Sequence, residues 1–207
     1  MTPTAELDDA IAALRRGAVV GVPTDTVYGL AVDPSRHGAT GALFALKGRP
    51  SNSDLPVLVA SIEDAEGLAG PAGLTPIARR LAEAFWPGAL TIVVTRRPEL
   101  DWVLGAHDQT IGLRCPASAI VRAVCEQAGP LATTSANLHG APPCTDAEAV
   151  RRVFGDGIAA VIDGGRCEGL PSTVVDVTYG VPRCLRPGAI SWTDVVGAAD
   201  RFVTGSR

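Results

Sequence analysis

The sequence predicts a single α/β domain in which short strands alternate with helices. Apolar runs of strand length recur along all 207 residues, and segments with helical spacing of apolar residues lie between them. The 23 glycines and 16 prolines fall at the ends of these runs, as expected for tight turns between short elements. We find no internal repeat, linker or charge run. The alternation leaves the order of the strands in the sheet undetermined.

The first part of the chain is expected to begin with a helix over residues 4–16. Leu7, Ile11 and Leu14 recur there at helical spacing, and Arg15-Arg16-Gly17 closes the segment. A strand over 18–24 follows, and its proline ends the ladder pairing before a polar loop. The elements expected next are a short helix near 38–47, a buried strand over 55–60, a helix over 62–68 after a serine cap, and a helix over 76–85 with proline at its start.

The rest of the chain continues the alternation. Trp86 is expected to anchor the core, and the Pro-Gly pair after it breaks the preceding helix. Glu148 stands in a capping-box position for a helix over 145–154. The other elements expected are strands over 90–95, 110–115, 131–137, 158–162, 173–177 and 183–186, and helices over 118–128 and from 191 to about 202.

The amino-acid composition limits the classes of protein to which the chain can belong. With 46% hydrophobic and 19% charged residues, the chain resembles an ordinary globular protein. A net charge of −4 argues against non-specific coating of nucleic acid, and 4% aromatics argue against a base-stacking platform. Five cysteines without a Cys-x-x-Cys pair, and three scattered histidines, predict no metal site and reduced thiols in a cytoplasmic protein. The N-terminus lacks signal-peptide features, and no apolar run approaches the roughly 20 residues that cross a membrane.

Two polar segments in the first quarter of the chain could form a binding site. Pro23-Thr-Asp-Thr-Val-Tyr-Gly29 crowds small hydroxyls and a carboxylate into one turn. Lys47-Gly-Arg-Pro50 places an ammonium and a guanidinium two residues apart, a pair that suits a polyanion such as a nucleotide phosphate. Each segment also has a structural interpretation, the first as a capped turn and the second as helix-terminal cations that interact with the helix dipole.

Arg114 is an isolated cation at the end of an apolar strand, so its burial would require a partner, either a ligand carboxylate or an ion pair. His107 and His139 are expected to be surface loop residues. The sequence lacks a phosphate-binding loop, a dinucleotide glycine fingerprint and a nucleophile elbow. What remains is a set of Arg, Lys, Ser, Thr and Asn residues at strand ends, among them Ser135, Asn137, Ser172 and Arg186. Such a set suits chemistry by positioning and charge stabilisation.

Taken together, these segments resemble the YrdC-type threonylcarbamoyl-AMP synthase family. The resemblance runs over residues 19–188 and implies one YrdC-like domain over 1–207, with a twisted mixed sheet, flanking helices, a concave substrate cleft and a C-terminal helix over about 191–203. The chain resembles the short form, without the extra C-terminal domain of longer relatives. The segments that carry the resemblance are Pro-Thr-Asp-Thr-Val-Tyr-Gly-Leu, Lys-Gly-Arg-Pro, Phe-Trp-Pro-Gly-Ala-Leu-Thr, Gly-Leu-Arg-Cys-Pro, Thr-Ser-Ala-Asn-Leu, Ser-Thr-Val-Val-Asp and Leu-Arg-Pro-Gly.

The resemblance implies synthesis of threonylcarbamoyl-adenylate from L-threonine, bicarbonate and ATP, with Mg²⁺ carried by the ATP phosphates. A partner enzyme would then transfer the threonylcarbamoyl group to tRNA, which the synthase itself could contact transiently. The threonine-binding residues implied are Thr26, Arg114, Thr133 and Ser172. The ATP-binding residues implied are Lys47, Arg49, Ser53, Thr110, Ser135 and Arg186, and the catalytic signature is Lys47, Arg49, Ser135 and Asn137.

Two positions depart from the family. Leu58 lies where some members place a histidine against threonine, and Pro143 lies where some place a serine against ATP. Two other functions share this fold. One is an RNA-binding or ribosome-associated module, against which the acidic charge and the few aromatics count. The other is a carbamoyl-transfer domain of the hydrogenase-maturation kind, which usually sits in a longer chain with acylphosphatase and zinc-finger segments.

Overall fold

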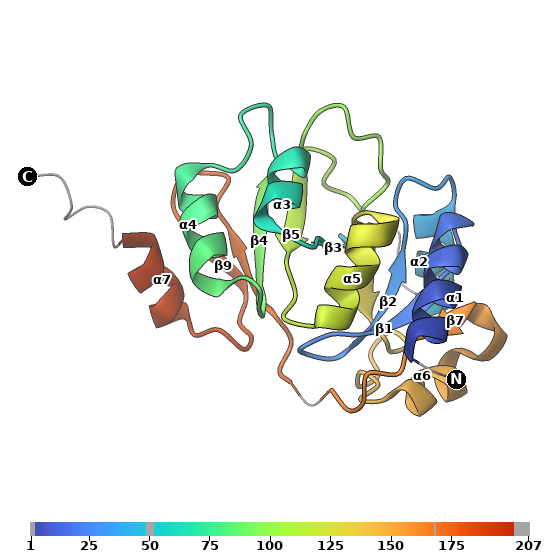
Figure 1. Cartoon of the computed structure of the whole chain (residues 1–207). Helices are drawn as coiled ribbons and strands as arrows, with labels where there is room; N and C mark the ends of the chain where they lie inside the picture. The colour runs from blue at the N-terminus through green and yellow to red at the C-terminus, as the bar shows by residue number, and fades with distance from the viewer. Residues whose placement is uncertain (1–2, 49–51, 168, 201–207) are drawn as a thin grey trace, which may run out of the picture.

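The computed structural model describes residues 3–48, 52–167 and 169–200. Within them, one mixed sheet contains nine strands (Figure 1). The strands are β1 (Val20–Pro23), β2 (Tyr28–Val32), β3 (Val57–Leu58), β4 (Leu90–Thr95), β5 (Thr110–Arg114), β6 (Leu131–Ser135), β7 (Ala160–Val161), β8 (Thr173–Asp176) and β9 (Arg183–Arg186). Their order across the sheet is β7-β1-β2-β6-β3-β5-β4-β8-β9.

The short strand β3 joins two halves of this sheet. On one side it pairs antiparallel with β6, which continues through β2 and β1 to β7. On the other side it pairs parallel with β5, which continues through β4 and β8 to β9. Leu58 therefore lies opposite Leu131 on one neighbour and opposite Arg114 on the other. Segments that are far apart in the sequence meet at this joint.

Several helices start where the sequence supplies side-chain caps. Ser61 forms a reciprocal capping box with Asp64, and the hydroxyls of Thr75 and Ser118 accept the backbone N–H groups of Ala78 and Val121. The helices are α1 (Pro3–Arg15), α2 (Ala39–Lys47), α3 (Ile62–Leu68), α4 (Pro76–Phe85), α5 (Ala119–Ala128), α6 (Ala147–Phe154) and α7 (Trp192–Asp200), and Gly155–Gly157 forms a 3-10 turn. Figure 1 shows α3, α4 and α5 in front of the strands, with α7 beyond α4.

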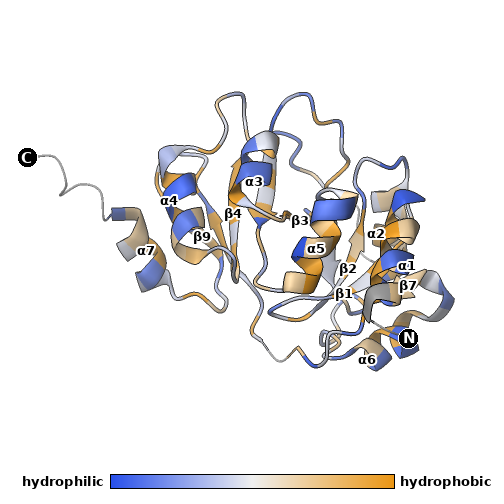
Figure 2. Cartoon of the chain, viewed as in Figure 1, coloured by the Kyte–Doolittle hydropathy of each residue, from blue (hydrophilic) through white to orange (hydrophobic). Residues whose placement is uncertain are grey.

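The β1–β2 half of the sheet is covered on both faces. Ala31 of β2 packs in one cluster with Leu14 of α1 and Val121 of α5, whereas Leu30 packs in another with Leu43 of α2. Neighbouring residues of β2 thus enter different clusters, because side chains along a strand alternate between faces. Figure 2 shows hydrophobic and hydrophilic residues alternating along the helices, as expected for helices with one face on a sheet.

The β4–β5 half of the sheet has helices on one face and cavities on the other. Leu90, Ile92 and Val94 of β4 belong to the hydrophobic core together with residues of α3, α4 and α7. Thr91 and Val93, which alternate with them, line a cavity on the opposite face. The period-2 pattern of this strand therefore decides which side chains reach the candidate site.

Most of the expected elements are confirmed. The helices over 62–68 and 76–85 and the strands over 90–95 and 183–186 have the predicted bounds. No strand is expected between the strand over 18–24 and the helix near 38–47, but β2 begins at Tyr28 and forms a hairpin with β1. The strand expected over 55–60 is reduced to β3, since only its two residues pair with β6 and β5.

The cap expected for the helix over 145–154 is also wrong. Asp146 is the N-cap residue, its carboxylate accepting the backbone N–H of Ala149 at 2.8 Å, and the helix begins at Ala147. Trp86 is buried in the core as expected, and its indole N–H donates to the carbonyl of Leu90 at 2.7 Å. Among the described residues, no helix is long and apolar enough to span a membrane. All five cysteines are free thiols, and Cys184 is the exposed one.

Candidate functional site

A cavity of about 270 Å³ lies where the hairpin between β1 and β2 faces the ends of β5, β6 and β8. Its walls combine hydroxyl groups, two guanidinium groups, one carboxylate and several apolar side chains. All four residues that the sequence predicts for threonine line this cavity, and they are Thr26, Arg114, Thr133 and Ser172. Each is buried. The sheet order brings them together from four separate segments.

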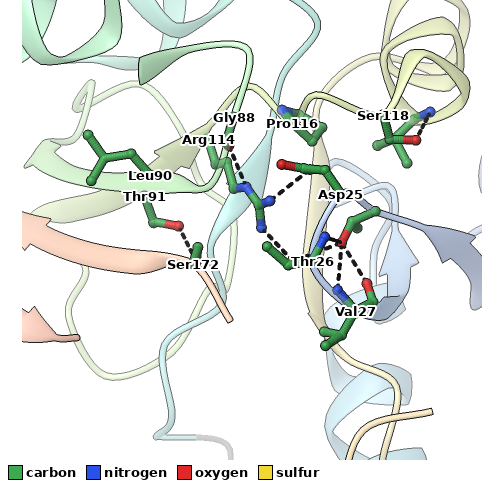
Figure 3. Close-up of polar contacts among 12 residues, drawn as sticks. Asp25, Thr26, Val27, Gly88, Leu90, Thr91, Arg114, Pro116, Ser118 and Ser172 are labelled. Carbon is green, nitrogen blue, oxygen red and sulfur yellow. Dashed lines mark hydrogen bonds and ion pairs between the residues drawn. The ribbon is translucent and has the colours of Figure 1, made fainter. Parts of the chain in front are cut away.

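Arg114 is a buried charged residue in the wall of this cavity, and the protein holds it through three hydrogen bonds (Figure 3). Its Nε donates to the carbonyl of Gly88 at 3.0 Å, its Nη1 to the hydroxyl of Thr26 at 3.1 Å, and its Nη2 to the carboxylate of Asp25 at 2.8 Å. These bonds use three of the five N–H groups of a guanidinium, so within the described part of the chain two remain for a ligand. Of the two interpretations of Arg114, the structure confirms the ion pair, and the binding of a ligand carboxylate stays a prediction.

The electrostatics of Arg114 follow from its burial. Desolvation lowers the pKa of Arg114 below its usual value, and the neighbouring Asp25 carboxylate opposes this effect. An arginine stays protonated in proteins even when buried, so the cavity wall carries a fixed positive charge. A small carboxylate is the natural counterpart of such a planar, pre-oriented group.

The loop between β1 and β2 is held by its own hydroxyl groups. The hydroxyl oxygen of Thr24 accepts the backbone N–H groups of Thr26 and Val27, at 3.1 and 3.2 Å, and donates to the carbonyl of Val27 at 2.6 Å. Gly169 approaches from another segment, donating its N–H to the carbonyl of Thr26 at 2.8 Å. A Cβ at Gly169 would lie 2.8 Å from the Cα of Thr26, so only glycine allows this approach. The loop is both a capped turn and a wall of the cavity.

Lys47, Ser135 and Asn137 form a second polar cluster beside the cavity. The ammonium of Lys47, at the end of α2, donates to the hydroxyl of Ser135 at 3.2 Å and to the side-chain oxygen of Asn137 at 2.8 Å, and it also contacts the Ser135 carbonyl. Ser135 donates its own hydroxyl proton to Asn137 at 2.6 Å. The buried ammonium of Lys47 thus contacts the end of β6, so it does more than interact with the dipole of α2. Arg49 lies outside the described residues.

Ser172 connects the cavity to a third polar group. Its hydroxyl lies 2.9 Å from the hydroxyl of Thr91, and both side chains are buried (Figure 3). The guanidinium of Arg186 donates to the hydroxyl of Ser172 at 3.0 Å and to its carbonyl at 2.8 Å. Sequence reasoning missed Thr91. The available signal was its place as the polar last residue of Phe-Trp-Pro-Gly-Ala-Leu-Thr, on a strand that is otherwise apolar at its start.

A second cavity of about 440 Å³ adjoins the first. Thr110, predicted for ATP, lines this second cavity and not the first. The shared lining residues are Asp54, Pro56, Thr91 and Arg186. Much of its wall is apolar, formed by Leu55, Val93, Leu104, Ile111, Val174, Tyr179 and Leu185. Ser53 lines neither cavity, although the next residue, Asp54, lines both.

The two departures from the family both face the first cavity, where Leu58 and Pro143 supply apolar wall. His107 is an exposed loop residue, as expected, and its Nδ1 lies 2.6 Å from the carboxylate of Asp54 at the rim of the second cavity. Among the described residues, no group of three or more His, Cys, Asp or Glu side chains is arranged to hold a metal ion.

Comparisons with known proteins agree with this geometry. The family model Sua5/YciO/YrdC, described as "Telomere recombination", matches residues 12–188. A Mycobacterium tuberculosis protein is 43% identical over 88% of this chain and 83% of its own length. The threonylcarbamoyl-AMP synthase of Yersinia enterocolitica is 36% identical over 85% of this chain and 93% of its own length.

Among solved structures, that of P. abyssi Sua5 complexed with L-threonine is similar to this chain with a TM-score of 0.88 and 34% identity. The similarity covers 96% of this chain and 58% of the P. abyssi chain. This chain therefore spans little more than half the length of that relative.

Proposed function

The chain belongs to the Sua5/YciO/YrdC family, and from that premise we propose that it synthesises L-threonylcarbamoyl-adenylate from L-threonine, bicarbonate and ATP, releasing pyrophosphate. The observation that carries the proposal is Arg114, a buried guanidinium with two uncommitted N–H groups, as far as the described residues go, in a cavity lined by small hydroxyls. The threonine complex of a relative and the synthase names of others support it.

Threonine would bind in the smaller cavity. Its carboxylate would take the two remaining N–H groups of Arg114, a bidentate pairing that planar guanidinium groups favour. Thr26, Thr133 and Ser172 would supply hydroxyl groups around the amino acid, and Leu58 would replace a polar contact with apolar wall. A buried charge pair of this kind discriminates strongly against ligands that lack the carboxylate, because the arginine would then lose a partner inside the cavity.

ATP would lie across the junction of the two cavities. The larger cavity offers an apolar wall suited to a base, and Thr110 and Arg186 line it. The triphosphate would lie toward the Lys47 cluster and Ser135, with Arg49 and Ser53 as further phosphate contacts. Magnesium would arrive on the phosphates, where it would shield their charge.

The reaction requires the protein to align the substrates and to stabilise the charge that develops on the phosphates. Threonine and bicarbonate would form an N-carboxylate with loss of water, and one of its oxygens would attack the α-phosphorus of ATP. The bond from that phosphorus to the bridging oxygen would break, and pyrophosphate would leave with the electron pair. Lys47 and Ser135, held together with Asn137, would stabilise the charge that develops on the phosphates.

The product would be consumed by a partner enzyme that transfers the threonylcarbamoyl group to an adenosine of tRNA, in the cytoplasm. Transient contact with tRNA belongs to the same proposal. The alternative of an RNA-binding module is less well supported, because a cavity built around a buried arginine serves a small carboxylate, and RNA binding needs no such pocket. The hydrogenase-maturation alternative is less well supported because relatives that match most of the chain are named synthases.

The test is pyrophosphate release from ATP by the purified protein with bicarbonate and each amino acid in turn. We expect release that requires both L-threonine and bicarbonate. Arg114→Lys, which keeps the charge but loses the planar fork, should raise KM for threonine at least about 30-fold, equivalent to about 2 kcal/mol of binding. Arg114→Ala should abolish release within the range of soluble threonine.

Arg152→Ala is the matched control, because Arg152 is largely exposed on α6 and its ion pair with Glu148 is long, at 3.8 Å. It should behave as the wild type does. A urea unfolding curve for each variant separates loss of binding from loss of the fold. The opposite outcome is a wild-type protein that releases no pyrophosphate with threonine but binds RNA with a steep salt dependence. The synthase proposal would then be wrong, and the RNA-binding function would replace it.

A further inference from the structure

Thr91 and Ser172 form a pair of buried hydroxyls at the junction of the two cavities. Thr91 is 2% exposed and lies at the start of β4, and Ser172 is 6% exposed and lies just before β8. Their oxygens are 2.9 Å apart. Thr91 lines both cavities, whereas Ser172 lines the smaller one. The pair therefore stands between the proposed threonine and nucleotide sites.

The donors around this pair limit how its hydrogen bonds can be arranged. Arg186 donates to the hydroxyl oxygen of Ser172 at 3.0 Å, so that oxygen acts as an acceptor. In the described part of the chain, Ser172 is the hydrogen-bond partner of the Thr91 hydroxyl, and a buried hydroxyl proton requires an acceptor. Either hydroxyl of the pair can be the donor, and Thr91 is the donor in one of the two arrangements. With Thr91 as the donor, the oxygen of Ser172 accepts two bonds and its own proton is left for an acceptor in the cavity.

The position of Ser172 is fixed by its backbone as well. Arg186 donates through Nε and Nη2 to the Ser172 carbonyl, at 3.2 and 2.8 Å. Gly188 packs directly on the same peptide, since a Cβ there would lie 2.5 Å from the carbonyl carbon of Ser172. The freedom left to Ser172 is thus the rotation of its hydroxyl, and Thr91 is the group that restricts this rotation.

We infer that Thr91 is a positioning residue that holds the Ser172 hydroxyl as a hydrogen-bond donor toward an oxygen acceptor of the bound amino acid or its N-carboxylate. The inference rests on the proposed function and deepens it. Because Arg186 lines the nucleotide cavity and shares Ser172 with Thr91, the same pair links the two substrate sites. Removal of the Thr91 hydroxyl should therefore weaken threonine binding through the loss of its hold on Ser172.

The experiment measures threonine binding by calorimetry and the steady-state constants of pyrophosphate release. Thr91→Val keeps the shape of the side chain and removes its hydroxyl. We expect Kd and KM for threonine to rise about tenfold, the size of one lost hydrogen bond, while KM for ATP changes much less. Thr91→Ser keeps the hydroxyl and should restore most of the affinity.

A double-mutant cycle shows whether Thr91 acts through Ser172. Thr91→Val combined with Ser172→Ala should bind threonine no more weakly than Ser172→Ala alone. Thr95→Val, at the exposed end of the same strand, is the matched control and should bind as the wild type does. Circular dichroism and thermal unfolding establish that each variant is folded.

The outcomes separate the two proposals. If wild-type protein binds threonine and Thr91→Val binds it equally well, or if the two changes add, the positioning role is wrong and the proposed function stands. If the wild type neither binds threonine nor releases pyrophosphate with it, the proposed function fails and the positioning role fails with it.

Discussion

Asp25 holds one arm of Arg114 at 2.8 Å, and the pair is largely buried, with 7% of the Arg114 side chain and 17% of the Asp25 side chain exposed. The carboxylate thus offsets the cost of desolvating the guanidinium, and it also fixes the orientation of the guanidinium plane. Thr26 and Gly88 hold the other nitrogens, so Arg114 is oriented from three sides before any ligand binds. Such pre-organisation reduces the entropy that binding must otherwise offset.

Asp25→Asn tests this orientation. Asparagine can still accept one hydrogen bond, but it leaves the guanidinium without a counter-charge. We expect the free energy of unfolding to fall by about 2 kcal/mol, as for a lost charge-assisted hydrogen bond, and KM for threonine to rise. Urea unfolding and pyrophosphate release measure the two effects. Excess threonine should recover part of the lost stability, because a carboxylate ligand replaces the missing charge.

Asp33→Asn is the control, since Asp33 is also a buried carboxylate paired with an arginine, Arg36, but neither residue lines the cavity. It should leave KM for threonine unchanged. An Asp25→Asn variant with wild-type KM and stability would contradict the orienting role.

Sequence reasoning reached Arg114 but not its partner. An isolated cation at the end of an apolar strand is an unusual pattern, and it indicated a buried guanidinium directly. The pairing with Asp25 joins residues 89 positions apart, so it depends on the order of the strands. That order follows from tertiary packing, which single-sequence patterns do not encode. The contact between Thr91 and Ser172 was hidden for the same reason.

Among the elements, β2 shows most clearly why a local pattern can mislead. Tyr28-Gly-Leu-Ala-Val32 follows a polar loop and contains a glycine, and no strand was predicted over it. In the structure Pro23 pairs with Tyr28, so residues 24–27 form the connection of a hairpin. The helices were predicted better, because their caps are encoded by single residues such as Ser61 and Thr75.

The segment after β9 fixes the backbone of Ser172 by a close approach at Gly188. A Cβ there would lie 2.3 Å from the carbonyl oxygen of Pro171, and that oxygen accepts the N–H of Ala189 at 2.9 Å. Gly188→Ala should therefore push this segment away from Ser172 and lower the free energy of unfolding by about 1–3 kcal/mol. Because Arg186, the last residue of β9, lies only two positions before Gly188, KM should rise for both threonine and ATP.

Gly197→Ala is the matched control, since Gly197 lies within α7 and a Cβ there would meet nothing within 4 Å. Alanine favours the helix, so this variant should be more stable by about 0.5–1 kcal/mol, with unchanged KM values. Urea unfolding and steady-state kinetics of both variants provide the test. Equal effects of the two substitutions would argue against a specific contact at Gly188.

For the molecule as a whole, the site exists because one sheet joins two halves through β3. Thr26 belongs to the hairpin of one half, whereas Arg114 and Ser172 belong to the strands of the other. The sequence motifs therefore indicate which residues matter, and the sheet order explains how they meet. The helices cover one face of β4 and β5, which leaves the opposite face available for substrates.

The buried thiols make the whole fold sensitive to alkaline pH. Burial raises the pKa of Cys115, Cys125, Cys144 and Cys167, most strongly for Cys125. In the unfolded chain these thiols ionise near pH 8.5, whereas in the folded protein they stay protonated to higher pH. The unfolded state then binds fewer protons, so the free energy of unfolding is unaffected well below pH 8.5 and falls as pH rises above it.

For a thiol that stays protonated in the folded state, the loss is about 1.4 kcal/mol at pH 9.5. We expect urea unfolding to show a lower free energy at pH 9.5 than at pH 7.5 in reducing buffer. Cys125→Ala should lose about 1.4 kcal/mol less than the wild type over this interval, because alanine has no proton to release. Cys184→Ala, at the exposed position, should keep the full wild-type loss. If Cys125→Ala lost as much as Cys184→Ala, the alkaline sensitivity would have to come from groups other than the buried thiol.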